Sequence, residues 1–131
     1  MNSRMLLLVA AVLGAAGIAI GAFGAHSLPK LLEGLSESQI LEREDWLETG
    51  VRYHMYHVPT LMALAFAGDR FGKFTLVAWL WIVGVLIFSG CLYAMSLTGI
   101  RILGAIVPIG GLSLLIGWIV LGTKAWSVKA A

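Results

Sequence analysis

Long segments without a single charged side chain constrain this 131-residue sequence more than any other feature. Residues 5–25, 74–100 and 102–123 contain no Asp, Glu, Lys or Arg over 21, 27 and 22 positions. A helix rises about 1.5 Å per residue, so about 20 apolar residues cross the roughly 30 Å hydrocarbon core of a bilayer. So short a chain has too few other residues to cover three such helices with protein. The sequence therefore predicts an integral membrane protein with several crossings.

The composition excludes several classes of protein. Hydrophobic residues make up 60% of the chain and charged residues only 12%, whereas a soluble domain has about 25% charged residues. The net charge of +2 is small and the basic residues are scattered, which argues against a nucleic-acid partner. The only cysteine, Cys91, excludes an intrachain disulfide. We expect one membrane domain over residues 1–131, with the lipid bilayer as its first partner.

The charge pattern predicts an all-α bundle of four membrane spans, at residues 5–25, 49–67, 74–95 and 102–122. The second span is the least apolar, because it includes Arg52, two histidines and Pro59. Residues 28–48 are predicted to form an amphipathic helical segment at the membrane surface. In this segment Pro29 suits a first helical position, and Ser36 with Gln39 matches a capping box that opens a second helix. Residues 68–73 are expected to form a turn.

Glycine spacing indicates where helices pack closely. Gly14, Gly17, Gly21 and Gly24 recur at intervals of 3, 4 and 3 residues, which places them on one helix face. The same segment follows a basic start, as a signal peptide does, but it exceeds the usual apolar core of about 7–15 residues. We therefore expect it to remain as a span. In the fourth span, Pro108 is expected to kink the helix, and Gly110, Gly111 and Gly117 are further packing positions.

Four spans would place both termini on the same side of the membrane. Five of the nine Lys and Arg residues then lie on that side: Arg4, Arg70, Lys73, Lys124 and Lys129. The positive-inside rule accordingly favours cytoplasmic termini.

Histidines are the main candidates for chemistry. His57 lies ten residues before the predicted inner end of its span, which is about 15 Å and close to the bilayer midplane. His54 is nearly on the same face, and His26 follows the first span. Ser89 and Tyr93 fall in the same outer half of the third span. Because polar side chains in a membrane usually face the bundle interior, these five residues are predicted to line a polar pocket.

Three interpretations of these histidines remain open. In the first, each imidazole bonds a carbonyl or hydroxyl group and holds two helices in register. In the second, they line a path for protons, ions or small solutes, since histidine titrates near neutrality. In the third, they bind a metal or haem, although the third and fourth spans contain no histidine and no carboxylate lies at mid-membrane depth.

No complete catalytic motif is present. The sequence has no glycine-rich phosphate loop with a following lysine, no His-Glu-x-x-His and no Gly-x-Ser-x-Gly. We therefore predict no catalytic residue, no metal ligand and no cofactor. The leading hypothesis is a non-enzymatic structural or accessory protein. It would associate with itself or with a larger membrane complex through its glycine faces.

Several short motifs of the sequence resemble those of a known family. They are GAFGAH at 21–26, TGVRYHMYH at 49–57, FSGCLY at 88–93 and PIGG at 108–111. In this order they resemble the small four-span family typified by YgdD, over about residues 5–122. The resemblance implies a four-helix inner-membrane protein and no activity, because the family is classed as a domain of unknown function.

The resemblance places His26 and His57 in the histidine-containing motifs of that family. This sequence departs from the pattern at Val58-Pro59, where Ala-Leu is expected. Cys91 and Val107 also differ, since serine and threonine are more usual there. The segment around residues 36–44 is longer than in many relatives.

Overall fold

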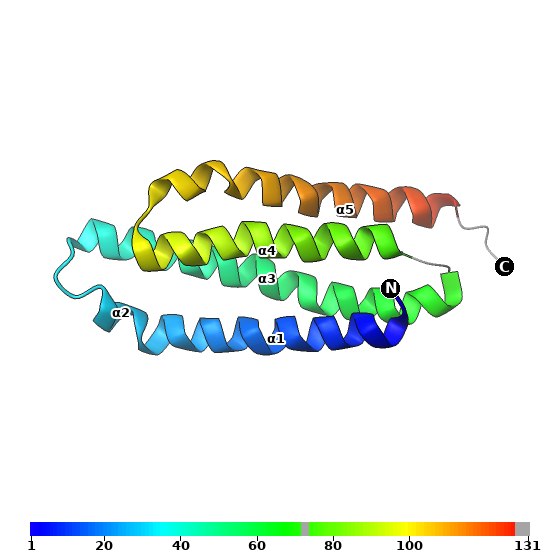
Figure 1. Ribbon diagram of the computed structural model, residues 1–131, viewed down its shortest axis with the longest axis horizontal. Coiled ribbons are helices and arrows are strands. Elements are labelled where there is room, and N and C mark those ends of the chain that lie inside the picture. The colour runs from blue at the N-terminus through cyan, green and yellow to red at the C-terminus, as the bar shows by residue number, and fades with distance from the viewer. Residues whose placement is uncertain (72–73, 128–131) are drawn as a thin grey trace.

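The computed structural model describes residues 1–71 and 74–127, and all regular elements in these two ranges are helical. Four long helices lie side by side along one axis (Figure 1). They are α1 (Ser3–His26), α3 (Glu37–Phe71), α4 (Thr75–Thr98) and α5 (Val107–Ser127). The all-α fold predicted from the sequence is therefore confirmed for this part of the chain.

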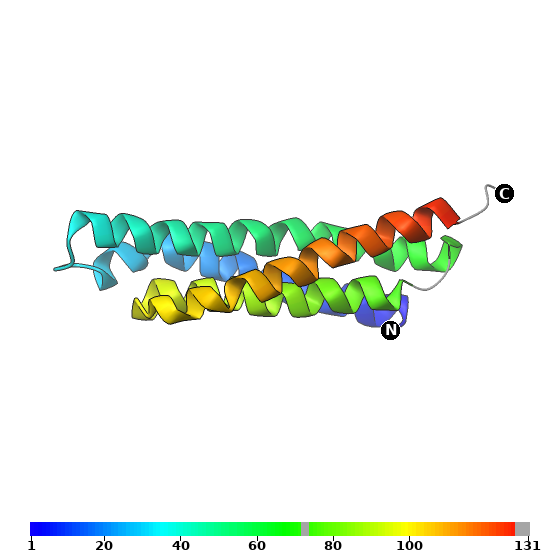
Figure 2. The same cartoon turned by 90° about the horizontal axis from the view of Figure 1, so that it is seen from above.

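Consecutive long helices run antiparallel, with α1 packed on α3, α3 on α4 and α4 on α5 (Figures 1 and 2). The start of α1 and the end of α5 lie at the same end of the bundle. There the amino group of Met1 is 3.4 Å from Oγ1 of Thr75, and Nζ of Lys124 is 5.9 Å from the centre of the Phe74 ring. The short helix α2 (Leu28–Leu31) and the 3-10 helix η1 (Arg101–Ala105) lie at the opposite end.

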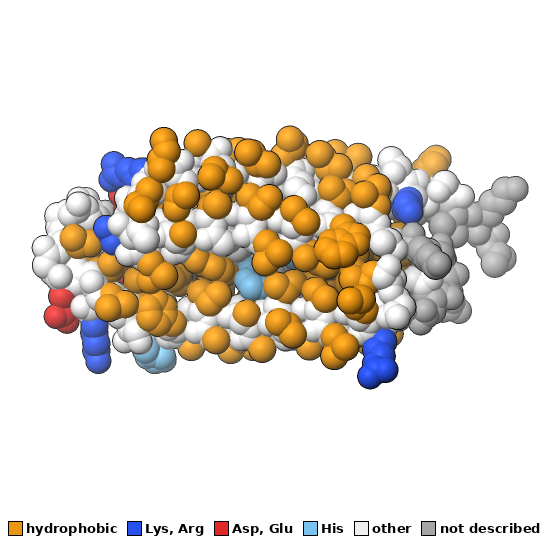
Figure 3. Space-filling model, viewed as in Figure 1, with side chains coloured by type: hydrophobic (Ala, Val, Ile, Leu, Met, Phe, Trp, Pro, Cys, Tyr) orange, Lys and Arg blue, Asp and Glu red, His pale blue; other side chains and the backbone are white. Residues whose placement is uncertain are grey.

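Within the described residues, three helical segments are long and apolar enough to cross a membrane: Ser3–His26, Thr75–Thr98 and Arg101–Ser127. They correspond to the predicted spans at residues 5–25, 74–95 and 102–122. Figure 3 shows hydrophobic side chains over most of the visible face, with charged side chains towards the two ends. Large apolar side chains such as Val12 and Ile18 are 68% and 66% exposed. Such a surface is suited to lipid rather than to water.

Helix α3 is one continuous helix of 35 residues, so no break separates the predicted amphipathic segment from the second span. Its start confirms the predicted capping box. The Ser36 N–H donates to Oε1 of Gln39 at 3.1 Å, and the Gln39 N–H donates to Oγ of Ser36 at 3.4 Å. At about 1.5 Å per residue, α3 is about 52 Å long and exceeds the thickness of a hydrocarbon core.

The expected turn at residues 68–73 is wrong in its first part, because α3 continues to Phe71. Positions 72 and 73 of that turn lie outside the described residues. The helix persists there because the residues before it are good helix formers that pack against α1 and α4.

The expected kink at Pro108 is also wrong. The chain before it forms η1, and α5 begins at Val107, so Pro108 occupies the second position of a new helix. Proline lacks an N–H group, but N–H groups in the first turn have no intrahelical partner to lose. Pro108 therefore starts the α-helix instead of bending it.

Charged side chains fix the end of the bundle that carries α2 and η1. Helix α4 ends at Gly99, whose φ of +73° is a left-handed cap. The Arg43 guanidinium of α3 packs against this glycine and donates to the Leu97 carbonyl at 3.2 Å. Arg101 also forms an ion pair with Glu42, at 2.6 Å. A cation at a helix C-terminus is favourable to the helix dipole, so these contacts hold α4 and η1 against α3.

The α4–α5 interface is closest where α5 carries glycine. A Cβ atom on Gly110 would collide with the backbone of Phe88, and one on Gly111 would lie 3.5 Å from the Phe88 ring. A Cβ atom on Gly117 would lie 2.5 Å from Nε1 of Trp81. Between these positions, the Ser113 hydroxyl donates to the Leu80 carbonyl at 2.7 Å. The close contact places the Trp81 indole against α5 near the centre of the bundle.

We predict that Gly110→Ala destabilises the bundle, because its methyl group would overlap the α4 backbone. Overpacking of this kind costs about 1–3 kcal/mol. The matched control is Gly122→Ala on the same helix, where nothing lies within 4 Å of the added Cβ atom. Thermal unfolding in mild detergent should show a lower Tm for Gly110→Ala and an equal or higher Tm for Gly122→Ala. Equal Tm values for both variants would contradict the assigned interface.

Candidate functional site

The glycine face of α1 is the surface on which α3 of the same chain packs. A Cβ atom at Gly17 would lie 2.5 Å from the sulfur of Met55, and one at Gly14 would lie 3.2 Å from Val58. The four contacts are Gly14 with Val58, Gly17 with Met55, Gly21 with Val51 and Gly24 with Leu47. The stripe is therefore occupied within the chain, and a partner helix could reach it only by displacing α3.

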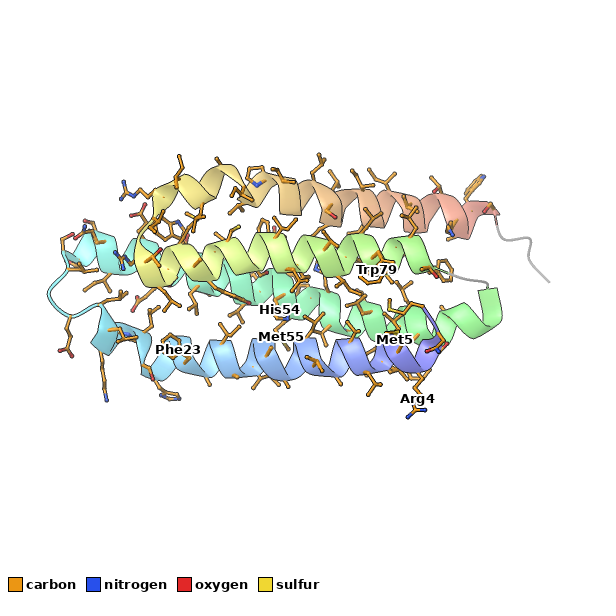
Figure 4. All side chains as sticks on the ribbon, in the orientation of Figure 1. Arg4, Met5, Phe23, His54, Met55 and Trp79 are labelled. Atoms are coloured by element: carbon orange, nitrogen blue, oxygen red, sulfur yellow. The ribbon has the colours of Figure 1, made fainter. Side chains whose placement is uncertain are left out.

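His54 lies on α3 about half-way along the bundle and is 4% exposed (Figure 4). Its Nδ1 atom is 3.0 Å from the Tyr93 hydroxyl of α4. A Cβ atom at Gly17 would lie 3.7 Å from Cδ2 of this imidazole, so the other side of the ring faces α1. His54 thus lies where α1, α3 and α4 meet.

Gly50 allows Tyr93 to reach this histidine. A Cβ atom at Gly50 would come within 2.7 Å of Cε1 of the Tyr93 ring. The ring therefore lies flat on α3, one turn before His54, and its hydroxyl extends to the imidazole. Sequence reasoning missed Gly50, although its spacing of four residues from His54 places both on one helix face.

Four buried polar atoms make no hydrogen bond of ordinary geometry within the described residues. They are Nε2 of His54, Nε1 of Trp81, Oγ of Ser89 and Oγ of Ser96. Ser89 and Ser96 lie on the same face of α4 as Tyr93, at spacings of four and three residues. Two of these side chains still interact with polar groups, His54 with the Leu13 backbone and Ser89 with the Tyr93 side chain.

His57 is 4% exposed and makes two hydrogen bonds that define its tautomer. Its Nδ1 atom is 2.7 Å from the Tyr53 carbonyl, which can only accept, so Nδ1 carries the hydrogen. The Nε2 atom then has a lone pair, and it accepts from Nε1–H of Trp118 at 3.3 Å. His57 is therefore neutral, with both ring nitrogens engaged.

Two tryptophans surround the His57 ring. The ring centres of His57 and Trp81 are 5.7 Å apart, those of His57 and Trp118 are 6.3 Å apart, and both pairs meet edge to face. The two indoles are 4.7 Å apart. Because Trp81 belongs to α4 and Trp118 to α5, this cluster joins α3, α4 and α5 at one level of the bundle.

The five residues predicted to line one pocket do not all meet. His54 and Tyr93 are in contact, and Ser89 lies one turn from Tyr93 on the same face of α4. His57 is directed towards α5 instead. His26 is exposed as the last residue of α1, since α1 contacts α3 through its glycine face and not through its end.

The described residues contain no group of three or more His, Cys, Asp or Glu side chains that could hold a metal ion. The lone pair of neutral His57 is already used by Trp118. His54 and the half-buried Cys91 do not complete a ligand set.

Two cavities lie near opposite ends of the bundle. One, of about 200 Å³, is lined by Met1, Leu6 and Phe74, among others. The other, of about 420 Å³, lies between the end of α1, α2 and the first half of α3. Neither cavity is lined by His54 or His57.

Antiparallel apolar helices with a lipid-suited exterior and a few buried polar side chains define a polytopic α-helical membrane protein. The model of a family described as "Protein of unknown function (DUF423)" matches residues 20–111. The chain belongs to this family, as its sequence motifs predicted.

Relatives of similar length support this assignment. The chain is 40% identical over 125 residues to the UPF0382 membrane protein YwdK of Bacillus subtilis, across 93% of this chain and 96% of the relative. It is 37% identical over 131 residues to a UPF0382 membrane protein of Haemophilus influenzae, across 99% of each chain. It is 32% identical over 135 residues to the inner membrane protein YgdD of Escherichia coli K12, across 98% of this chain and 95% of the relative.

No solved structure matches the chain. The family and the apolar helices together confirm the predicted location in the membrane.

We predict that Tyr93→Phe lowers the stability of the bundle by about 1–3 kcal/mol, because it removes the partner of a buried imidazole nitrogen. Tyr56→Phe is the matched control, since Tyr56 is 60% exposed on the same bundle. The measurement is chemical or thermal unfolding in one detergent, followed by tryptophan fluorescence. If the two variants unfold alike, the His54–Tyr93 hydrogen bond does not support the fold.

Proposed function

We propose that this protein is a non-enzymatic structural or accessory component of the membrane, in which buried polar side chains hold the helices in register. The observation that carries the proposal is the fixed state of His57. Both nitrogens of its ring are engaged, one with a carbonyl of its own helix and one with Trp118. An imidazole held in this way links helices but has no free site for a proton, a metal or a substrate.

The proposal includes a fourth crossing, formed by α3. Residues 53–68 of α3 are 16 positions without formal charge, and their outward side chains Tyr56 and Phe66 are 60% and 66% exposed. The contacts of Gly14 with Val58 and of Gly24 with Leu47 align α3 along most of α1. A helix packed in this manner between two membrane-crossing neighbours shares their depth. The lengths of α1, α4 and α5 thus support a bundle of four crossings, and the distribution of Lys and Arg favours cytoplasmic termini.

This topology predicts the labelling of single cysteines in a chain that carries Cys91→Ser. Ser127→Cys and Gly68→Cys should react from the cytoplasmic side, and Ser36→Cys should react from the opposite side. The measurement is modification by a membrane-impermeant maleimide in intact cells and in inverted vesicles. Labelling of Ser36→Cys and Gly68→Cys from the same side would show that α3 does not cross.

Association with a second copy or with a larger complex is part of the same proposal. Because α3 occupies the glycine stripe of α1, a partner would contact the outward faces of the bundle instead. The outer helices α1 and α5 offer such faces, with Ile18 66% and Ile109 60% exposed.

A path for protons or small solutes is the second candidate. The buried Nε2 atom of His54, on the side of the ring that faces α1, and the hydroxyl groups of Ser89 and Ser96, on the Tyr93 face of α4, make no hydrogen bond of ordinary geometry within the described residues. Polar side chains inside a membrane bundle often line the path of a transported ion or solute.

Proton flux separates the two candidates. The purified protein is reconstituted into vesicles that contain a pH-sensitive dye, and a potassium gradient with valinomycin supplies the potential. A structural role predicts a rate equal to that of empty vesicles, since the imidazoles are buried and His57 is fully bonded. Flux above that rate that is lost in His54→Phe but kept in the control His26→Phe would favour the path.

A further inference from the structure

The cavity between α1, α2 and the first half of α3 takes no part in the proposed structural role. Its walls are apolar and include Gly21 and Ala25 of α1, Leu28 of α2, and Leu47 and Val51 of α3. Its volume of about 420 Å³ lies within the range of ligand sites, which is about 300–1,000 Å³. On the α1 side the cavity borders Gly21 and Gly24, where Val51 and Leu47 of α3 pack against α1.

The depth of this cavity corresponds to a membrane surface. Gly21 and Ala25 belong to the last turns of α1, which ends at His26. The other lining residues include Glu44 and Glu48, which precede the charge-free part of α3. One part of the cavity is therefore apolar, as an acyl chain requires, and another part carries carboxylates at the level of lipid headgroups.

The two carboxylates are not equivalent. Glu48, which lines the cavity, forms an ion pair at 2.5 Å with Arg52, the residue after the lining residue Val51. Glu44 is half-buried and has no ion pair within the described residues. The cavity thus has an unpaired carboxylate at Glu44, and the partner of its second carboxylate is a guanidinium group of a kind suited to phosphate.

We propose that this cavity binds a phospholipid whose headgroup carries a primary ammonium group. One acyl chain occupies the apolar part, the phosphate lies at Arg52, and the ammonium group donates to the Glu44 carboxylate. A primary ammonium has N–H groups for a charge-assisted hydrogen bond, whereas a trimethylammonium group has none. An anionic headgroup without a cation is repelled by Glu44.

Native mass spectrometry of the intact chain in mixed micelles tests this proposal. Phosphatidylethanolamine, phosphatidylcholine and phosphatidylglycerol with the same acyl chains compete for the protein. We expect about a tenfold preference for phosphatidylethanolamine, the effect of one charge-assisted hydrogen bond. Glu44→Gln should remove the preference. The control Asp45→Asn should keep it, because Asp45 is exposed and does not line the cavity.

A second variant tests the cavity itself. Ala25 is exposed at its mouth, and Ala25→Phe places a ring in the space without disturbing the buried core. We expect this variant to lose binding of phosphatidylethanolamine at the site while its Tm without lipid stays unchanged. Equal binding of the three lipids, a preference that survives in Glu44→Gln, or a dimer that Ala25→Phe dissociates would overturn the proposal. None of these outcomes depends on whether the bundle transports protons.

Discussion

The close contact between the glycine face of α1 and α3 is the constraint on which the rest of the structure depends. Helix α3 is the least apolar long helix, with charges through its first half and Pro59 inside its second. Its second half gains stability mainly from packing, since helices in lipid associate through close van der Waals contact and hydrogen bonds. The glycines bring the two backbones close along α1. That approach also turns His54 and His57 inward, towards α4 and α5.

Polar groups in the bundle centre act as specific links between helices that apolar packing alone would leave free to rotate. His54 connects α3 to α4 through Tyr93, and His57 connects α3 to α5 through Trp118. The two links lie one turn apart on α3 but lead to different helices. A rotation of α3 that preserved one of them would break the other. The two histidines therefore fix the orientation of α3 as well as its position.

Much of the fold follows from local sequence patterns, and less of the site does. The apolar runs predicted α1, α4 and α5, and the Ser36 capping box predicted the start of α3 within one residue. The sequence predicts a kink at Pro108, but Pro108 lies in the first turn of α5. Proline can bend a helix or begin one, and the conformation of the preceding residues decides which occurs. The pocket was only partly predicted, since depth in the membrane does not say which way a side chain points. His26 shares the outer half with His54 but lies on an exposed helix end.

Of the two ends of the bundle, the one that carries α2 and η1 has the greater capacity for recognition. Chain reversals there are made by α2, Gly99 and η1, and they are fixed by Arg43 and by the ion pair of Arg101 with Glu42. With these charges already paired or bonded, Glu44 is left directed at an apolar cavity. A carboxylate in such a place is stable only where water or a cation reaches it. A lipid headgroup can supply that cation at the depth where α1 ends. The charged first half of α3 thus supplies both carboxylates of the proposed site.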